Sequence, residues 1–194
     1  GGMLAQWWPI ATQNDEDSQS LVRSMLDVFP YVSLWTTELH EMMIIGSMKP
    51  MPLDFDLVAQ RMRMPGIAAA LQEVGVTTPA DLLATYVTDR TGLEDYAQDA
   101  LPVTDDRPRI EYAHWVRRNE LNHILPKLLA YRAPPPIAAS AAEKARIEAS
   151  YSQLAEFYEL LLLLMARDQG FFARVQAFQQ SSAPNAYFEW FLRR

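Results

Sequence analysis

The hydrophobic pattern of the first 47 residues predicts a strand, a helix and a pair of strands. Met3–Trp8 is an apolar run too short for an ordinary helix, and such a run is typical of a strand buried on both faces of a parallel sheet. Asn14 and the acidic residues after it predict a helix start, and Pro30 ends that helix. Residues 31–37 and 42–47 favour β structure and are close enough to pair as a hairpin. This order describes half of an open α/β sheet.

The position of the first strand admits two interpretations. An interior strand of a doubly wound sheet needs neighbours on both sides, yet Met3–Trp8 begins two residues into the chain. One interpretation is that the chain is the back end of a larger α/β protein. The other is a small α+β domain with one short sheet covered by helices. The pattern alone supports both equally.

After residues 49–52 the hydrophobic period becomes helical. Asp54 is placed to cap one helix, and Pro65 begins another that Gly75 ends. Thr78 and Asp81 have the spacing of a capping box. The helix that they start is predicted to carry Leu82, Leu83, Tyr86 and Val87.

The remaining pattern is mainly helical. Residues 92–98 and 120–131 are predicted helices, the second bent at Pro126, with a turn at residues 104–108 between them and a stiff spacer at 132–136. Beyond the spacer we predict one long helix and two shorter ones, at residues 138–167, 171–179 and 186–192. The long helix has one apolar seam, formed by Leu154, Phe157, Leu161 and Leu164. We expect this seam to pack against the rest of the protein, with a dimer contact as the alternative.

Composition narrows the classes of partner. The chain of 194 residues is 49% hydrophobic, enough for one or two domains. Its 17 basic and 24 acidic residues give a net charge of −7, which argues against a nucleic-acid partner. It has no cysteine, so it forms no disulfide or thiolate metal site, and we expect a cytoplasmic location. No signal peptide is visible, and the longest aliphatic run, residues 160–165, is far shorter than the ~20 residues of a membrane helix. Any membrane tether of a parent protein would lie outside this chain.

Two stretches carry a resemblance to a known family. The order GGMLAQWW, an acidic helix ending in FP, YVSLWTT and EMMIIGS, followed by TDDRPRIEY at residues 104–112, resembles the end of the catalytic domain of the spermidine synthase (aminopropyltransferase) family. The similarity covers residues 1–115. It implies α/β architecture: the last strands of a Rossmann-like, methyltransferase-type sheet followed by a mainly α-helical region. The corresponding domains are 1–50, the end of the catalytic domain; 51–131, a helical buttress containing the TDDRP turn; and 137–194, an α-helical tail.

The resemblance implies transfer of an aminopropyl group from decarboxylated S-adenosylmethionine to an amine. In the family, the glycine-rich nucleotide loop, the acid that holds the ribose and the proton-accepting Asp all precede the strand with which this chain begins. We therefore expect the chain alone to be inactive, to bind no cofactor, and to need the missing N-terminal half as its partner. A polyamine-type small molecule and a homo-oligomer are the other expected partners. The alternative function is a non-catalytic helical module for protein interaction or dimerisation, in which the aromatic tail binds the partner.

The hydrophobic pattern and the family resemblance together indicate candidate site residues. Gln6 ends the first strand, where ligands of open α/β sheets bind, and the matching family residue lies near the amine; a buried amide that satisfies the backbone is the alternative. Trp7 is expected in the core or pocket wall. Glu38, with Glu41, has the charge to recognise an ammonium, although exposed hairpin carboxylates are usually only solvated. The family's Pro-Thr-Tyr-Pro-type segment is replaced at residues 36–41 by TTELHE, a difference that bears on amine specificity.

A paired carboxylate is the remaining candidate. Asp105 and Asp106 could contact a metal or an amine, but the favoured interpretation is a turn in which they cap backbone amides and pair with Arg107 or Arg109. The three histidines, His40, His114 and His123, show no ligand spacing, and no metal site is predicted.

Overall fold

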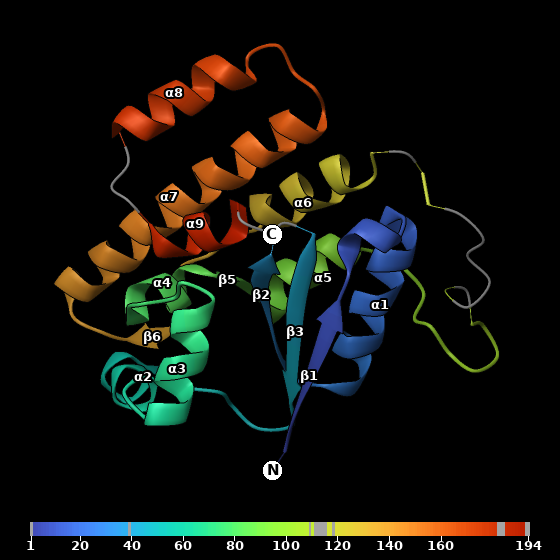
Figure 1. The fold of residues 1–194 in the computed structure, drawn as a ribbon. Helices are drawn as coiled ribbons and strands as arrows, with labels where there is room; N and C mark the ends of the chain where they lie inside the picture. Colours follow the sequence, from blue (N-terminus) through green and yellow to red (C-terminus); the bar gives the residue numbers. More distant parts are fainter. Residues whose placement is uncertain are drawn as a thin grey trace. The chain divides into compact units, whose positions relative to one another are not determined.

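The computed structural model describes residues 2–38, 40–108, 110, 116–117, 119–181 and 185–192. The chain is mixed α/β and divides into two compact units, each built from two separated segments (Figure 1). Unit 1 consists of Gly1–Met51 and Tyr86–Pro135, and unit 2 of Pro52–Thr85 and Pro136–Arg194. The three consecutive domains expected from the sequence stay a prediction.

Unit 1 is organised around an antiparallel sheet with the strand order β1-β3-β2-β5. Its strands are β1 (Met3–Trp8), β2 (Tyr31–Glu38), β3 (Glu41–Ser47) and β5 (Tyr86–Asp89). β1 and β2 both pair antiparallel with β3, so they run in the same direction on either side of it. The connection between them passes through η1 (Ile10–Thr12) and α1 (Asp15–Val28). The predicted succession of strand, helix and hairpin is therefore confirmed.

The environment predicted for β1 is wrong. Trp8 is the only residue of β1 that is buried; Met3 is 70% exposed and Trp7 52% exposed. In the described part of the chain β1 is at the edge of the sheet, and its neighbour β3 is antiparallel. A short apolar run indicates strand structure, but the number of neighbours that bury the strand depends on pairings that local sequence does not encode.

One face of the sheet is covered by α1. At Gly46 in β3, a Cβ atom would lie 2.5 Å from the ring of Phe29, so the end of the α1 segment packs directly onto the backbone of the strand. The residues on this face of β2 and β3 are buried: Val32, Leu34, Thr36, Met42 and Ile44. The alternate residues on the opposite face are only half-buried, among them Ser33, Trp35, Met43 and Ile45.

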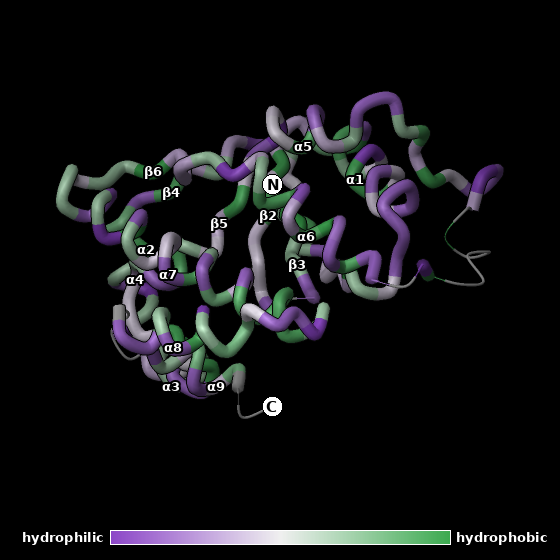
Figure 2. Tube along the Cα trace, turned by 90° about the horizontal axis from the view of Figure 1, so that it is seen from above, coloured by the Kyte–Doolittle hydropathy of each residue, from purple (hydrophilic) through white to green (hydrophobic). Residues whose placement is uncertain are grey.

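Two further helices complete unit 1. α5 (Arg90–Ala97) packs on α1, β2 and β5, and α6 (Leu121–Ala130) contacts η1. α5 contains both hydrophilic and hydrophobic residues (purple and green in Figure 2), and its buried residues are Leu93, Tyr96 and Ala97. Arg90 donates hydrogen bonds to the carbonyls of Leu26 (3.0 Å) and Phe29 (2.8 Å), which satisfies acceptors at the C-terminal end of α1. The helices predicted at 92–98 and 120–131 are thus confirmed, with Pro126 inside α6.

Unit 2 is mainly helical. Its helices are α2 (Phe55–Met62), α3 (Pro65–Glu73), α4 (Pro79–Ala84), α7 (Ala141–Met165), α8 (Phe171–Ser181) and α9 (Ala186–Leu192). A parallel pair of two-residue strands, β4 (Leu53–Asp54) and β6 (Ile137–Ala138), joins its two chain segments. α4 packs on α7, and α8 also contacts α7.

Most predicted helix boundaries in unit 2 are confirmed by their caps. The Asp54 side chain accepts from the amide of Leu57 (2.8 Å), and Thr78 and Asp81 form the predicted capping box. Gly75 follows α3 with a φ of 72°, a conformation that favours glycine. Tyr86 and Val87 were predicted as helix but belong to β5, because α4 ends at Ala84 and Tyr86 pairs with β2. The long helix starts at 141 rather than 138, because residues 137–138 pair with β4.

Aromatic side chains form the core of unit 2. Phe157 of α7 stacks on Phe188 of α9, with ring centroids 4.2 Å apart, and the ring of Phe178 lies 6.4 Å from that of Phe157. The predicted seam is buried at Leu154, Phe157 and Leu161. Leu164, at its end, is 48% exposed.

Among the described residues, the helices lack the combination of length and apolar character needed to cross a bilayer.

Candidate functional site

The carboxyl ends of β1 and β2 lie at the same end of the sheet, on either side of β3. Trp8 pairs with Met42, and Met42 pairs with Thr36 on the other side, so the last residues of the two strands are aligned across β3. The segment after β1 also reaches the hairpin, where the amide of Ala11 donates to the carbonyl of His40 (3.4 Å). In open α/β sheets ligands bind beyond such strand ends. This end of the sheet is therefore the candidate functional site.

Gln6 and Trp7 lie on the outer strand, β1, near this end of the sheet. The prediction that Gln6 ends the strand is wrong, because β1 continues to Trp8. Gln6 is exposed, and its side-chain amide donates to the carbonyl of Trp7 (2.8 Å). The alternative of a buried amide is therefore wrong for this chain. Trp7 lies in register with Met43 and, beyond it, Trp35, which places the three side chains on the half-buried face of the sheet. Both candidates are accessible, and Trp7 is part of an apolar surface rather than the core.

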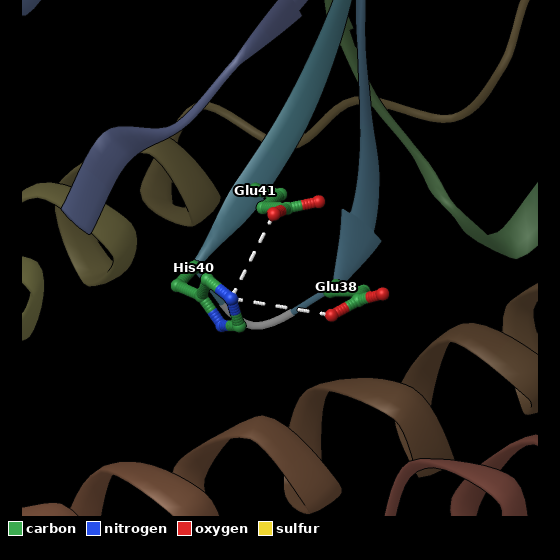
Figure 3. A group of neighbouring side chains, drawn as sticks. All are labelled: Glu38, His40 and Glu41. Atoms are coloured by element: carbon green, nitrogen blue, oxygen red, sulfur yellow. Dashed lines mark ion pairs between the residues drawn. The ribbon is translucent and has the colours of Figure 1, made fainter. Parts of the chain in front are cut away.

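The hairpin between β2 and β3 brings together a group that sequence spacing does not single out. Glu38, His40 and Glu41, which we call the hairpin cluster, point toward one another at the ends of the two strands (Figure 3). His40 Nε2 lies 4.0 Å from Glu38 Oε2 and 3.8 Å from Glu41 Oε1. The side chains are 45%, 16% and 26% exposed for His40, Glu38 and Glu41, respectively. The prediction of an ordinary histidine overlooked this convergence.

The hairpin cluster depends on an irregularity in strand pairing. The register of β2 against β3 shifts between Thr36 and Glu38, and Glu38 then pairs directly with Glu41. A bulge of this kind re-aims the side chains at the end of a strand. The local sequence contains acidic residues and a histidine within four positions, but the bulge that turns them toward one point is not evident from it.

Asp105 and Asp106 lie in a separate part of unit 1. They form an exposed turn closed by the amide of Arg107 donating to the carbonyl of Thr104 (2.8 Å), as the turn prediction expected. The preceding segment is held on α1, since the amide of Val103 donates to Ser24 Oγ (2.8 Å). Within the described residues, no hydrogen bond or ion pair links this turn to Gln6, Trp7 or the hairpin cluster. Arg109 and residues 111–115, which carry the end of TDDRPRIEY, lie outside the described residues.

A polar network surrounds the start of α1, directly after β1. Asp15 accepts from Lys127 Nζ (2.6 Å) and from the Tyr96 hydroxyl (2.8 Å), and its own amide donates to Glu120 Oε1 (2.9 Å). Tyr96 and Glu120 are buried. Burial, followed by the neighbouring Asp15 carboxylate, raises the pKa of the Tyr96 hydroxyl far above its usual range. The network joins α1, α5 and α6.

At the exposed side of the start of α1, Arg117 and Glu16 form an ion pair. Arg117 donates to both carboxylate oxygens of Glu16 (2.8 and 3.0 Å), and its amide donates to Asn14 Oδ1 (2.9 Å). Hydrogen bonding to Glu16 raises the pKa of the exposed Arg117 guanidinium. The sequence identified the acidic first turn of α1 but not its partners, which lie about a hundred positions later. We interpret these contacts as structural, because the Asp15 carboxylate already accepts from Lys127, Tyr96 and Gln19.

Unit 2 contains a small hollow of about 20 Å³ between α4, α7 and the start of α9. It is lined by apolar and polar residues including Asp81, Ser150 and Tyr187. This space suits about one water molecule. It is too small for a metabolite, so the end of the sheet in unit 1 remains the candidate site.

Comparisons with known proteins add no family assignment: the chain matches no family profile, no curated protein and no solved structure.

Proposed function

We propose that this chain is the C-terminal portion of a spermidine-synthase-like aminopropyltransferase. The observation that carries the proposal is the relation of β1 to β2. The two strands run in the same direction and are connected through α1, which packs on the sheet. A strand–helix–strand crossover between strands of one direction is the repeating unit of Rossmann-like sheets. In this proposal β3 is an antiparallel strand added to such a sheet, as occurs in many doubly wound folds.

The exposure of β1 supports the same proposal. Met3, Leu4 and Trp7 are 70%, 41% and 52% exposed, although an apolar strand is normally covered. Among the strands of the described residues, β1 pairs with β3 alone. In the proposed parent protein, the next strand of the sheet pairs with the open side of β1, and its helices cover the half-buried face that carries Trp35 and Met43.

The proposed reaction is a nucleophilic substitution at carbon. The lone pair of the acceptor amine attacks the aminopropyl carbon bound to the sulfonium of the donor. The carbon–sulfur bond breaks, its electron pair stays on sulfur as a neutral thioether, and the new ammonium loses a proton to a base. By the family resemblance, that base and the nucleotide loop precede this chain. Gln6 would line the amine pocket, where exclusion of water and fixed orientation favour attack.

The test uses the intact protein that includes the polypeptide encoded before Gly1. Transfer is measured by mass spectrometry of the amine product, with decarboxylated S-adenosylmethionine and a series of diamines. We expect product with at least one amine, and a loss of roughly tenfold or more in kcat/KM for Gln6→Ala, the effect of a removed positioning contact. Gln72→Ala, an exposed glutamine of α3, is the matched control and should leave the rate unchanged. Absence of product with every amine, or equal rates for the Gln6 and Gln72 variants, would contradict the proposal.

A further inference from the structure

The donor atoms of the hairpin cluster surround one gap instead of bonding to one another. His40 Nε2 is 4.0 Å from Glu38 Oε2 and 3.8 Å from Glu41 Oε1, and one ligand atom from each residue lies within 4.8 Å of the others (Figure 3). Hydrogen bonds between such atoms are about 2.7–3.2 Å long. His40 Nε2 is therefore within ion-pair distance of both carboxylates but beyond hydrogen-bond distance, and the three atoms are about as far apart as the ligands of one metal ion.

The strand pairing places like charges against each other at this point. Glu38 and Glu41 are direct partners across the hairpin after the register shift at Thr36. Directly opposed like charges destabilise a strand pair. The two carboxylates are also the less exposed members of the cluster, at 16% and 26%. A cation bound by both carboxylates would reduce this repulsion, so the strand pairing and the distances suit a positively charged ligand.

We propose that Glu38, His40 and Glu41 form a binding site for a divalent transition-metal ion, of which Zn²⁺ is the representative. Zinc binds imidazole nitrogen and carboxylate oxygen at about 2.0–2.2 Å, so two of its ligand atoms lie at most about 4.4 Å apart. The two distances from His40 Nε2, 3.8 and 4.0 Å, are within this limit. The ligand atoms of Glu38 and Glu41 lie within 4.8 Å of each other, close to the same limit.

The chemistry of the donors selects the class of ion. One imidazole with two carboxylates suits Zn²⁺ and Mn²⁺ better than Ca²⁺ or Mg²⁺, which prefer oxygen ligands alone. His40 is 45% exposed, which leaves the remaining coordination positions open to water or to a ligand. Three protein ligands and an open position are the arrangement of reactive rather than purely structural zinc sites. This site is independent of the aminopropyl-transfer proposal.

The experiment is a titration of the whole chain, freed of metal by chelation, with Zn²⁺ by calorimetry and with Co²⁺ by visible absorption. We expect one equivalent to bind, and His40→Ala, Glu38→Gln and Glu41→Gln each to weaken the affinity at least tenfold. The matched controls are His123→Ala and Glu73→Gln, exposed residues of α6 and α3, which should bind as the original chain does. Circular dichroism establishes that each variant is folded; the two glutamine variants keep the size of the side chain and so protect the test if the alanine variant unfolds.

The outcomes separate the proposal from its alternatives. Loss of binding in the three cluster variants and not in the controls would support the site. Absence of Zn²⁺ and Co²⁺ binding, or binding that survives all three substitutions, would overturn it. A parallel titration with putrescine tests the other cation that two carboxylates can hold: binding of the diamine to the cluster with no binding of either metal would also overturn the metal site. None of these results depends on whether the intact protein transfers aminopropyl groups.

Discussion

The stacked aromatic pair of unit 2 and Trp7 of unit 1 lie in opposite environments. In unit 2, Phe157 and Phe188 stack at 4.2 Å and are only 3% and 6% exposed, so the helices enclose their own core. In unit 1, Trp7 lies on an edge strand and is 52% exposed. Apolar surface of this kind on a strand edge is a site for further pairing. The difference indicates that the chain itself covers the aromatic centre of unit 2, whereas β1 in unit 1 has an apolar edge that a neighbour can cover.

The largest expected effect is a loss of stability in unit 2, caused by a substitution at Gly75. Gly75 has a φ of 72°, and a Cβ added there would lie 2.3 Å from the backbone of Ala186. Gly75→Ala should therefore cost about 3 kcal/mol or more in free energy of unfolding, because backbone strain and a backbone collision add. Urea unfolding monitored by circular dichroism measures this. Gly66→Ala in α3, where a Cβ meets nothing within 4 Å, is the control and should be neutral or slightly stabilising. Equal stability of the two variants would show that α9 does not pack on Gly75.

The next effect tests the polar network of unit 1. Lys127→Met should lower the free energy of unfolding by about 1–3 kcal/mol, because Asp15 loses a partly buried partner at 2.6 Å. A double-mutant cycle with Asp15→Asn isolates the coupling. The same cycle on Arg174 and Glu159 of unit 2, a pair 55% and 64% exposed, should give no more than about 0.5 kcal/mol. Coupling energies of the same size in both cycles would contradict the structural role of Asp15.

The free energy of unfolding should also depend on pH through Tyr96 in unit 1. The pKa of Tyr96 is raised in the folded protein by burial and by Asp15, so the folded state holds its proton more tightly than the unfolded chain. This contribution is complete below the unfolded pKa of about 10 and is lost as the pH rises above it. Between pH 9 and pH 11, ionisation of this tyrosine in the unfolded state should lower the free energy of unfolding of the original chain by about 1.4 kcal/mol. Tyr96→Phe should not show this part of the loss. Denaturant titrations at several pH values measure it; an unchanged alkaline slope in Tyr96→Phe would refute the assignment.

The smallest effect on stability concerns the open edge. Ala5→Lys places a charge on the exposed strand β1 and should change the free energy of unfolding by less than about 0.5 kcal/mol. It should nevertheless reduce self-association of the chain, which sedimentation velocity detects. Lys substituted for Ala70, an exposed alanine of α3, is the control and should leave association unchanged. Association that is equal in both variants would show that the edge of β1 is not a pairing surface.

Sequence predicted the features that depend on neighbouring residues. The caps formed by Asp54 and by Thr78 with Asp81 were predictable because donor and acceptor lie within three positions. The hairpin of β2 and β3 was predictable for the same reason. These local signals account for most of the elements in both units.

Features that depend on distant contacts were not predictable. Tyr86 follows a helix with helical spacing but pairs with β2 at Trp35, and its helix prediction was wrong. The partner of Asp15 is 112 residues away in sequence, at Lys127. The hairpin cluster requires a bulge, and His40 alone gave no signal. In the candidate site, Gln6 was predicted to end the first strand, but β1 continues to Trp8. The exposure of Gln6 and the approach of His40 to the carboxylates were not predicted.

The central claim is that β1, α1, β2 and β3 form the end of a Rossmann-like aminopropyltransferase sheet. The most direct measurement is to determine the coding sequence immediately upstream of Gly1 in the intact gene. The account predicts an open reading frame that encodes a strand followed by a glycine-rich loop, with an acidic residue after the next strand. A start codon directly before Gly1, or an unrelated linker in that position, would contradict it.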